Sequence, residues 1–290
     1  MAKIESIGFG GRTVFKASGP FAFKVFVKML FSPFSLPFRD LLRSAWKNYF
    51  KTQYVNAPEV DVTTALDRRI PFVESAVRNY LSFVPLSLGV ISFLHAEFGR
   101  DACREIRDTL TKGEDLYAHA GGVYRSIQST FRREGNGWLG VKILRFIDKS
   151  KNCYPSLHTQ IVGEVYLLLR KSVGNYASHP DRYAQLEKQI FDQSVRILEA
   201  CCITKQHSVQ DIAAGFAALS YKDPEFTEDM ARDFMHHIFR SERYGLGEQL
   251  VLEIRAATER IYSSLVWELR AKDDYSLVFV SRLRAMGEAG

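Results

Sequence analysis

Apolar residues recur at three- and four-residue intervals along most of the chain beyond residue 70, which is the spacing of a helix with one buried face. Phe72, Ala76 and Tyr80, for example, fall on one such face. The same spacing predicts further helices over residues 83–98, 101–110, 115–133, 139–147, 158–169, 182–203, 206–221, 226–240 and 246–270. No strand-like alternation competes with it, so we expect an all-α fold in which one domain forms a helical bundle.

The first 60 residues have a different character. They carry nine Lys and Arg residues against three acidic ones, so they account for the whole net charge of +6 of the 290-residue chain. Residues 1–15 predict a loop or a short ragged strand, and residues 21–38 mix aromatic and aliphatic side chains with lysines and prolines. A basic and aromatic segment of this kind is typical of an element that lies on a lipid surface. The alternative is an arm that packs on the body with its lysines in solvent. The expected organisation is a basic, aromatic-rich arm over residues 1–60 and a helical domain over residues 61–290.

The chain has little that could span a membrane. Its longest uncharged run covers residues 79–96 and contains Asn79, Pro85 and His95. The other apolar stretches are broken by charges such as Glu164 and Glu199, and a central charge costs about 2.5–3.5 kcal/mol on insertion scales. We therefore expect a soluble helical protein that touches a membrane at its surface; the alternative is an integral protein in which residues 79–96 enter the membrane.

The cysteines and the N-terminus point to the cytoplasm. The four cysteines lack metal-ligand spacing, and two of them are adjacent, so we interpret all four as reduced thiols. No secretory signal pattern is found near the start. The expected localisation is cytoplasmic and peripheral to the membrane.

Two short motifs carry the candidate chemistry. The first is Pro155-Ser156-Leu157-His158, which places a histidine at the start of a predicted helix. The second is His207-Ser208-Val209-Gln210-Asp211, which sets a carboxylate four residues after a histidine, and hence on the same face of a predicted helix. Such a carboxylate can fix the tautomer of the imidazole by accepting one ring N–H, and it leaves the other ring nitrogen free to attack or to accept a proton.

These motifs resemble the Pro-Ser-x-His and His-x-x-x-Asp blocks of the phosphatidic acid phosphatase type 2 superfamily. Their flanks, with Asn152 before the first block and Thr204-Lys205 before the second, look like the branch that contains the inositol-phosphoceramide synthases and their bacterial relatives. The segment 67–72 is similar to the one that opens the core of that branch, so the resemblance covers residues 65–220. It implies a divergent member, here expected to be soluble because charges break its apolar stretches, whose bundle resembles the core shared with the vanadium haloperoxidases.

The resemblance also implies roles for the site residues. His207 would be the nucleophile that forms a phosphohistidine, His158 the general acid that protonates the leaving oxygen, and Asp211 the group that orients His207. Ser156 is a plausible N-cap whose neighbouring backbone N–H groups could hold a phosphate. This chemistry implies neither a metal nor any other cofactor.

Phosphoryl transfer also needs cations that face the equatorial oxygens of the phosphate. Arg125 and Arg132 lie seven residues apart and would share a face if residues 115–133 formed one helix. They depart from the family block, in which a lysine and a following proline are usual. Cys201 stands where the family has an arginine, and Lys205 is the expected substitute. If the arginines lie outside the site, Lys142, Arg145 and Lys149 are the next candidates.

Four functions fit these motifs to different degrees. The leading one is a phosphatase that hydrolyses a phosphomonoester or diphosphate with a lipid or isoprenoid tail. The second is a phosphotransferase that moves a phospho-headgroup to an alcohol, since water and alcohols can resolve the same phosphoenzyme. The third is vanadate-dependent peroxidation, and the fourth is a non-enzymatic membrane-surface protein that kept the fold. The expected partners are a phosphorylated small molecule or lipid and a membrane surface contacted through the N-terminal arm, with no nucleic acid.

Overall fold

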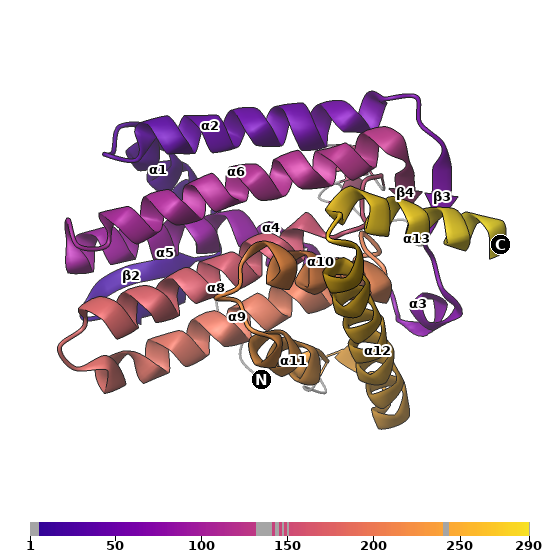
Figure 1. Cartoon of the computed structure of the whole chain (residues 1–290). Coiled ribbons are helices and arrows are strands. Elements are labelled where there is room, and N and C mark those ends of the chain that lie inside the picture. The colour runs from indigo at the N-terminus through magenta and orange to yellow at the C-terminus, as the bar shows by residue number, and fades with distance from the viewer. Residues whose placement is uncertain are drawn as a thin grey trace.

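The computed structural model describes residues 6–131, 141–142, 145–146, 148–149, 151–239 and 244–289. It is mostly helical, which confirms the all-α prediction in its coarse form (Figure 1). The helices are α1 (Gly19–Leu30), α2 (Ser35–Ala45), α3 (Ala65–Arg69), α4 (Val77–Leu81), α5 (Phe83–Phe98), α6 (Cys103–Ser126), α8 (Leu157–Tyr176), α9 (Ala184–Ile203), α10 (Val209–Lys222), α11 (Glu228–His237), α12 (Glu248–Lys272) and α13 (Tyr275–Ala289).

Two small sheets join these helices, and neither was clear from the sequence. Strand β1 (Ser6–Phe9) pairs antiparallel with β2 (Arg12–Lys16), and β3 (Glu59–Asp61) pairs parallel with β4 (Gln128–Thr130). Strands of three to five residues are too short to show a reliable alternation of apolar and polar positions. The hairpin of β1 and β2 begins in residues 1–15, for which the sequence predicted either a loop or a short ragged strand.

The prediction for residues 101–133 was wrong in two respects. The structure has a single helix, α6, in place of two, and Gly113 sits within it facing Leu41 of α2. The helix ends at Ser126 and β4 begins at Gln128, so residues 115–133 are not one helix. The proposed common face of Arg125 and Arg132 therefore fails, and Arg132 lies outside the described residues. Helix α13 was not predicted, and the predicted helix over residues 139–147 lies partly outside the described residues.

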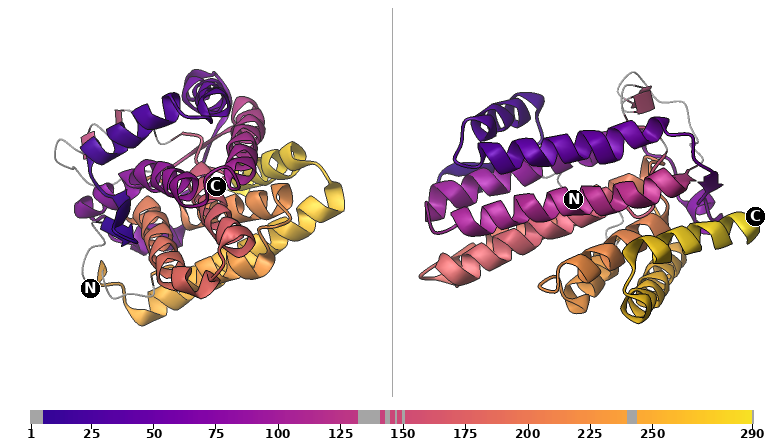
Figure 2. Two further views of the ribbon diagram at one scale, coloured as in Figure 1. Left: turned by 90° about the vertical axis from the view of Figure 1, so that its left-hand side faces the viewer. Right: turned by 45° about the horizontal axis from the view of Figure 1, so that its top comes forward.

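Long helices stacked side by side make up the body. Helix α6 packs on α2 and on α8, and α8 packs on α9, so that these four lie in succession across the molecule (Figures 1 and 2). Helix α12 packs along α10 on the other side of the bundle. The motif helices α8 and α10 contact each other at the centre of this arrangement.

Residues 6–60 are part of the body. Phe15 of β2, Met29 of α1 and Phe38 of α2 are buried in one core cluster together with Leu86 of α5 and Leu168 of α8. The alternative expectation, in which the segment packs on the body, describes this arrangement. Its exposed side is basic, as described below.

Gly215 allows the two motif helices to approach each other. A Cβ atom at this position would lie 2.7 Å from the carbonyl oxygen of Ser156 and 2.6 Å from the Cβ atom of Thr159. Both distances are shorter than a van der Waals contact, so only glycine lets α10 lie against the first turn of α8. The contact fixes the separation of the two histidine motifs.

We predict that Gly215→Ala lowers the free energy of unfolding by about 1–3 kcal/mol, which is the usual range for overpacking. Urea denaturation measures this loss. Gly174→Ala on α8 is the matched control, because a Cβ atom there meets nothing within 4 Å. The control should be neutral or stabilising, since alanine is favoured over glycine in a helix by up to about 1 kcal/mol. Equal stability of the two variants would show that the close approach at Gly215 is not needed.

Candidate active site

The first motif is held in place before α8 begins. The side chain of Ser156 caps α8 by accepting the N–H of Thr159 at 3.3 Å, as the sequence predicted for its role as N-cap. The hydroxyl of Tyr124 on α6 donates to the carbonyl of Pro155 at 2.8 Å, and Ser129 Oγ accepts two backbone N–H groups from the loop, at 2.7 Å each. These bonds fix the start of α8 and thereby the position of His158 in its first turn.

The second motif is a helix cap. Helix α10 starts at Val209, and Ser208 and Asp211 form a reciprocal capping box at its first turn. His207 therefore precedes the helix, and the expectation that it shares a helical face with Asp211 was wrong. The cap itself brings the two side chains together, with His207 Nδ1 at 3.5 Å from Asp211 Oδ2.

The two motif histidines face each other. His158 Nδ1 lies 3.1 Å from His207 Nε2, and the side chains of both are buried, with 6% and 3% of each residue exposed. His207 Nδ1 makes no hydrogen bond within the described residues, but the nearby Asp211 carboxylate favours a proton on that atom, and with this tautomer the Nε2 lone pair accepts the N–H of His158. The structure thus brings together His158, His207, Asp211 and Ser156.

Lys205 has a different environment from the one expected. Its residue adopts a left-handed backbone conformation with φ of 58°, and its buried Nζ donates to the carbonyls of Asp67 and Ile70, at 2.6 Å each. The Asp67 carboxylate in turn accepts the N–H of Val209 at 2.8 Å, at the start of α10. The segment that contains Asp67 and Ile70 therefore holds the second motif in place, and the Lys205 ammonium is one of the groups that bind the two together.

The other predicted cations point elsewhere. Arg125 is exposed and donates to Asn48 Oδ1 at 3.0 Å. Arg145 lies 5.5 Å from the ring centre of Phe72, Lys149 lies 3.8 Å from that of Tyr54, and Lys142 is exposed. No described contact joins Arg125, Lys142 or Lys149 to the histidine pair, and Arg132 is not described.

Burial sets the charge of His158. Its removal from water, followed by the proximity of His207, lowers its pKa from 6.5 to about 3, although Asp148 opposes the shift. The rings of Tyr80 and Phe83 pack against it, with ring centres 4.7 and 4.6 Å away. His158 is therefore neutral in the free protein at physiological pH.

This shift predicts a pH dependence of stability. Because the folded pKa lies below the unfolded one, the folded state resists protonation of His158, so stability is complete above pH 6.5 and falls as the pH drops towards 3. We expect the wild type to lose up to about 1.4 kcal/mol per pH unit more than His158→Leu between pH 5.5 and 4. Urea titrations of both proteins at several pH values measure this difference. Parallel curves would contradict it.

A cavity of about 220 Å³ reaches His158 from the surface side of α4 and α5. Its described lining is aromatic and aliphatic except for Asp148, which accepts the hydroxyls of Tyr49 and Tyr80. Sequence reasoning missed this trio. Tyr49 and Asp148 are 99 residues apart, and no spacing in the chain relates them.

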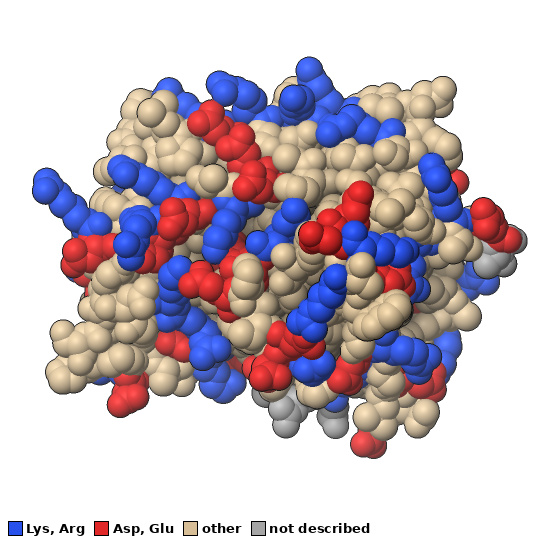
Figure 3. Space-filling view, viewed as in Figure 1, with Lys and Arg blue, Asp and Glu red and all other residues tan. Residues whose placement is uncertain are grey.

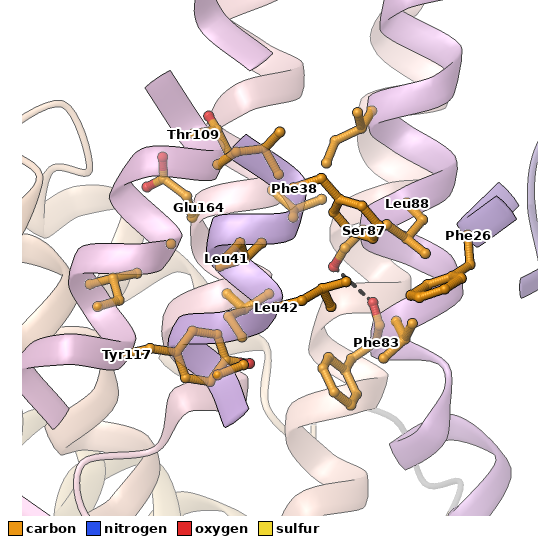
Figure 4. Close-up of a pocket in the computed structure, with 18 residues that line it drawn as sticks. Phe26, Phe38, Leu41, Leu42, Phe83, Ser87, Leu88, Thr109, Tyr117 and Glu164 are labelled. Carbon is orange, nitrogen blue, oxygen red and sulfur yellow. Dashed lines mark hydrogen bonds between the residues drawn. The ribbon is translucent and has the colours of Figure 1, made fainter. Parts of the chain in front are cut away.

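A second apolar cavity, of about 150 Å³, lies next to the first, and Figure 4 shows its lining. Both are lined by Phe83, Val84, Tyr117 and Ile161. The second ends beside Thr109 and Glu164, where burial and the nearby Asp223 raise the pKa of Glu164 to about 8, against the effect of Lys112. Lys112 lies 4.0 Å from Glu164 and is much closer to Asp223, so we regard the Glu164 carboxyl as neutral at pH 7.

Sulfur atoms also lie near the histidine pair. The Sγ atom of Cys201, one nitrogen of His158 and one of His207 all lie within 4.8 Å of one another. A second group, made of Cys153, His207 and Asp211, meets the same limit. Both groups are buried, and they are the two places near the motifs where described residues could hold a metal ion.

By length and composition, one described helical stretch could cross a membrane. It runs from Glu74 to Phe98, and half of its most apolar window is buried inside the protein. A sharply bent pair, Pro20–Leu30 with Ser35–Tyr54, passes the same test only when the two helices are taken together.

Comparison of this chain with protein-family models, with curated proteins and with solved structures finds no match.

Proposed function

We propose that this protein hydrolyses a phosphoric ester through a phosphohistidine on His207, without a metal. The observation that carries the proposal is the buried contact between His158 Nδ1 and His207 Nε2, with Asp211 at the far nitrogen of His207. This is the order of groups that an activated histidine nucleophile requires: a carboxylate, an oriented imidazole and a proton donor.

The reaction would proceed in two steps. His207 Nε2 attacks phosphorus and takes the phosphoryl group, while His158 gives a proton to the leaving oxygen. Water then attacks the phosphohistidine and gives a proton to His158, and the bond between phosphorus and His207 Nε2 breaks, which releases inorganic phosphate and restores both histidines. Asp211 would stabilise the positive imidazole ring of the phosphorylated intermediate. An alcohol in place of water would give the transferase reaction, which the same residues support.

The substrate must separate the two histidines. In the free protein the N–H of His158 bonds to His207 Nε2, the nitrogen that would attack phosphorus. A phosphate therefore has to enter between the two rings and accept this N–H in place of His207. A neutral imidazole is a poor acid, but the negative charge of a bound phosphate favours the protonated form of His158. The residue would thus become an acid when substrate binds.

The two joined cavities support a substrate with an apolar tail. They lead away from His158 between α2, α5, α6 and α8, and their described walls are almost wholly apolar. A phosphate at the histidine pair would place an acyl or isoprenoid chain along Phe83, Tyr117 and Ile161. This is the feature that favours a lipid phosphate over a soluble ester.

The outer side of α1 and α2 supports contact with a membrane surface. Phe23, Phe31, Leu36 and Trp46 are 59–82% exposed there, and Leu42, which lines the second cavity, is 37% exposed. The same segment carries exposed basic residues at positions 24, 28, 39, 43, 47 and 51. Figure 3 shows Lys and Arg side chains along the edge where α2 lies. Exposed aromatic residues among basic ones suit an anionic lipid surface, so we place the protein at the cytoplasmic face of a membrane.

The test is a phosphatase screen of the purified protein with a chelator present. Lipid phosphates, isoprenyl diphosphates and soluble esters are compared for phosphate release, with and without an alcohol acceptor. Turnover of the tailed esters is the expected result. Binding to anionic vesicles with no turnover of any ester would favour a non-enzymatic membrane protein.

We further predict that Ile161→Trp makes the protein prefer short chains. Ile161 lines both cavities, so a larger side chain there closes their junction. The ratio of kcat/KM for a long-chain ester to that for a short-chain ester should fall at least about tenfold, since each buried CH₂ contributes about 0.8 kcal/mol. Arg170→Trp on the same helix is the control, because Arg170 lines neither cavity. An unchanged ratio would place the tail elsewhere.

A further inference from the structure

We propose that His158, His207 and Cys201 form a binding site for a thiophilic divalent cation, of which Zn²⁺ is the prime example. The metal would be held by His158 Nδ1, His207 Nε2 and the Cys201 thiolate, with water or a small anion as the fourth ligand. Its effect on turnover rests on the proposed function, because the same two nitrogens would serve catalysis. The binding itself does not depend on that function.

The positions of the two nitrogens suit a metal. They lie 3.1 Å apart, whereas two nitrogens about 2.05 Å from a tetrahedral zinc lie about 3.3 Å apart. One nitrogen of each histidine lies within 4.8 Å of Cys201 Sγ, and a zinc–sulfur bond of about 2.3 Å needs a nitrogen–sulfur separation within that limit. Small movements of buried side chains would therefore complete the site.

The backbone fixes Cys201 next to His207. The carbonyl of Cys201 accepts the N–H of Gln206 at 3.1 Å and that of His207 at 3.0 Å, so the end of α9 and the second motif form one tight turn. This turn directs the Cys201 thiol and the His207 ring to the same place. A cationic side chain at this position would help to bind a phosphate. The cysteine that stands there offers a thiolate, which is a ligand for soft metals.

The surroundings also match a metal site. Asp211 Oδ2 lies 3.5 Å from His207 Nδ1, the placement of a carboxylate that orients a metal-bound histidine. The other Asp211 oxygen, Oδ1, is buried with no hydrogen-bond partner among the described residues. His158 lines the first cavity, which offers the ion a route from solvent. Coordination by the Cys201 thiolate would release the thiol proton to water, so the affinity should rise with pH.

Occupation of the site would stop phosphoryl transfer. The metal would take the His207 lone pair needed to attack phosphorus, and it would also take the atom of His158 that carries the acidic proton. Zinc would thus be a reversible inhibitor, relieved by a chelator. A substrate phosphate and the metal would compete for the space between the two rings.

The test is a titration of the full-length, metal-free protein with Co²⁺ as the spectroscopic probe. We expect saturable binding of one ion per chain, visible absorption of tetrahedral intensity, and a near-ultraviolet band from sulfur-to-cobalt charge transfer. Added Zn²⁺ should displace the cobalt and abolish both signals. None of these signals requires enzymatic activity, so they separate this proposal from the proposed function.

Variants identify the ligands. Cys201→Ser should lose the charge-transfer band and weaken binding at least about a hundredfold, and Asp211→Asn should weaken it by the 10–100-fold typical of an outer-shell residue. Cys153→Ser is the matched control, since Cys153 is buried beside His207 but belongs to the other group. It should keep the band. Circular dichroism and the midpoint of urea unfolding verify that each variant is folded, and Cys201→Ala replaces Cys201→Ser if the latter is not.

Three results would overturn the proposal. The first is a wild type without stoichiometric binding or without the charge-transfer band. The second is a band that survives in a folded Cys201 variant. The third is a band lost in Cys153→Ser, which would assign the ion to Cys153, His207 and Asp211.

Discussion

His207→Ala should abolish the turnover of every ester that the wild-type protein hydrolyses, with kcat/KM falling at least about 10⁴-fold, as it does when an enzyme loses its nucleophile. The reason is geometric. Asp211 lies at Nδ1 of this ring and His158 at Nε2, so His207 combines an orienting carboxylate with an adjacent proton donor. Acid-labile labelling of the wild type by a radioactive substrate should vanish in the variant.

The controls separate chemistry from folding. His207 is buried, so His207→Gln, which keeps most of the volume, should fold and yet lack both turnover and label. His179→Ala changes an exposed histidine and should leave both intact. A label that persists in the His207 variants, or that lies on serine, would end the assignment of His207 as nucleophile.

The sequence predicted which residues meet at the site better than it predicted how they meet. His158, His207 and Asp211 were proposed from motif order, and they lie together. The reason given for His207 and Asp211, a shared helical face, was wrong because the Ser208–Asp211 capping box starts α10 after His207. Capping depends on the backbone conformation of a single residue, which a spacing rule does not include.

Lys205 shows what a motif cannot reveal. Next to a histidine it suggests a phosphate ligand, but its buried ammonium bonds to the carbonyls of Asp67 and Ile70, more than 130 residues away in sequence. A local motif does not show which distant carbonyl groups a lysine meets in the folded chain. For the same reason the sequence did not reveal the trio of Tyr49, Tyr80 and Asp148.

Helix boundaries were predictable where the apolar period was long and clearly ended. Helix α9 lies within the predicted range 182–203, whereas α8 covers the predicted range 158–169 and continues to Tyr176. Gly113 lies in the gap between the helices predicted over residues 101–110 and 115–133; glycine usually weakens a helix, whereas here it lets α2 pack closely on α6. A close contact between helices is invisible in local sequence, and Gly215 is the second example.

His158→Ala should slow esters with poor leaving groups about 10²–10⁴-fold and esters with good leaving groups far less. A general acid is needed most where the departing alkoxide is strongly basic. His158 is suited to this role only when substrate is bound, because its pKa of about 3 makes it neutral in the free protein. The comparison is between the kcat values for an alkyl phosphate and a nitrophenyl phosphate, each measured at saturating concentration.

The control for this prediction keeps the packing around His158. Tyr80→Phe removes a hydroxyl that donates to Asp148 but preserves the ring that lies 4.7 Å from the His158 ring. It should affect the two esters equally, since it neither gains nor loses a proton donor for the leaving oxygen. If His158→Ala also slows both esters by the same factor, His158 binds the phosphate and does not protonate the leaving group. The pH dependence of kcat distinguishes the same two roles. If bound substrate makes His158 a protonated general acid, kcat should fall as the pH rises through the pKa of His158 in the complex.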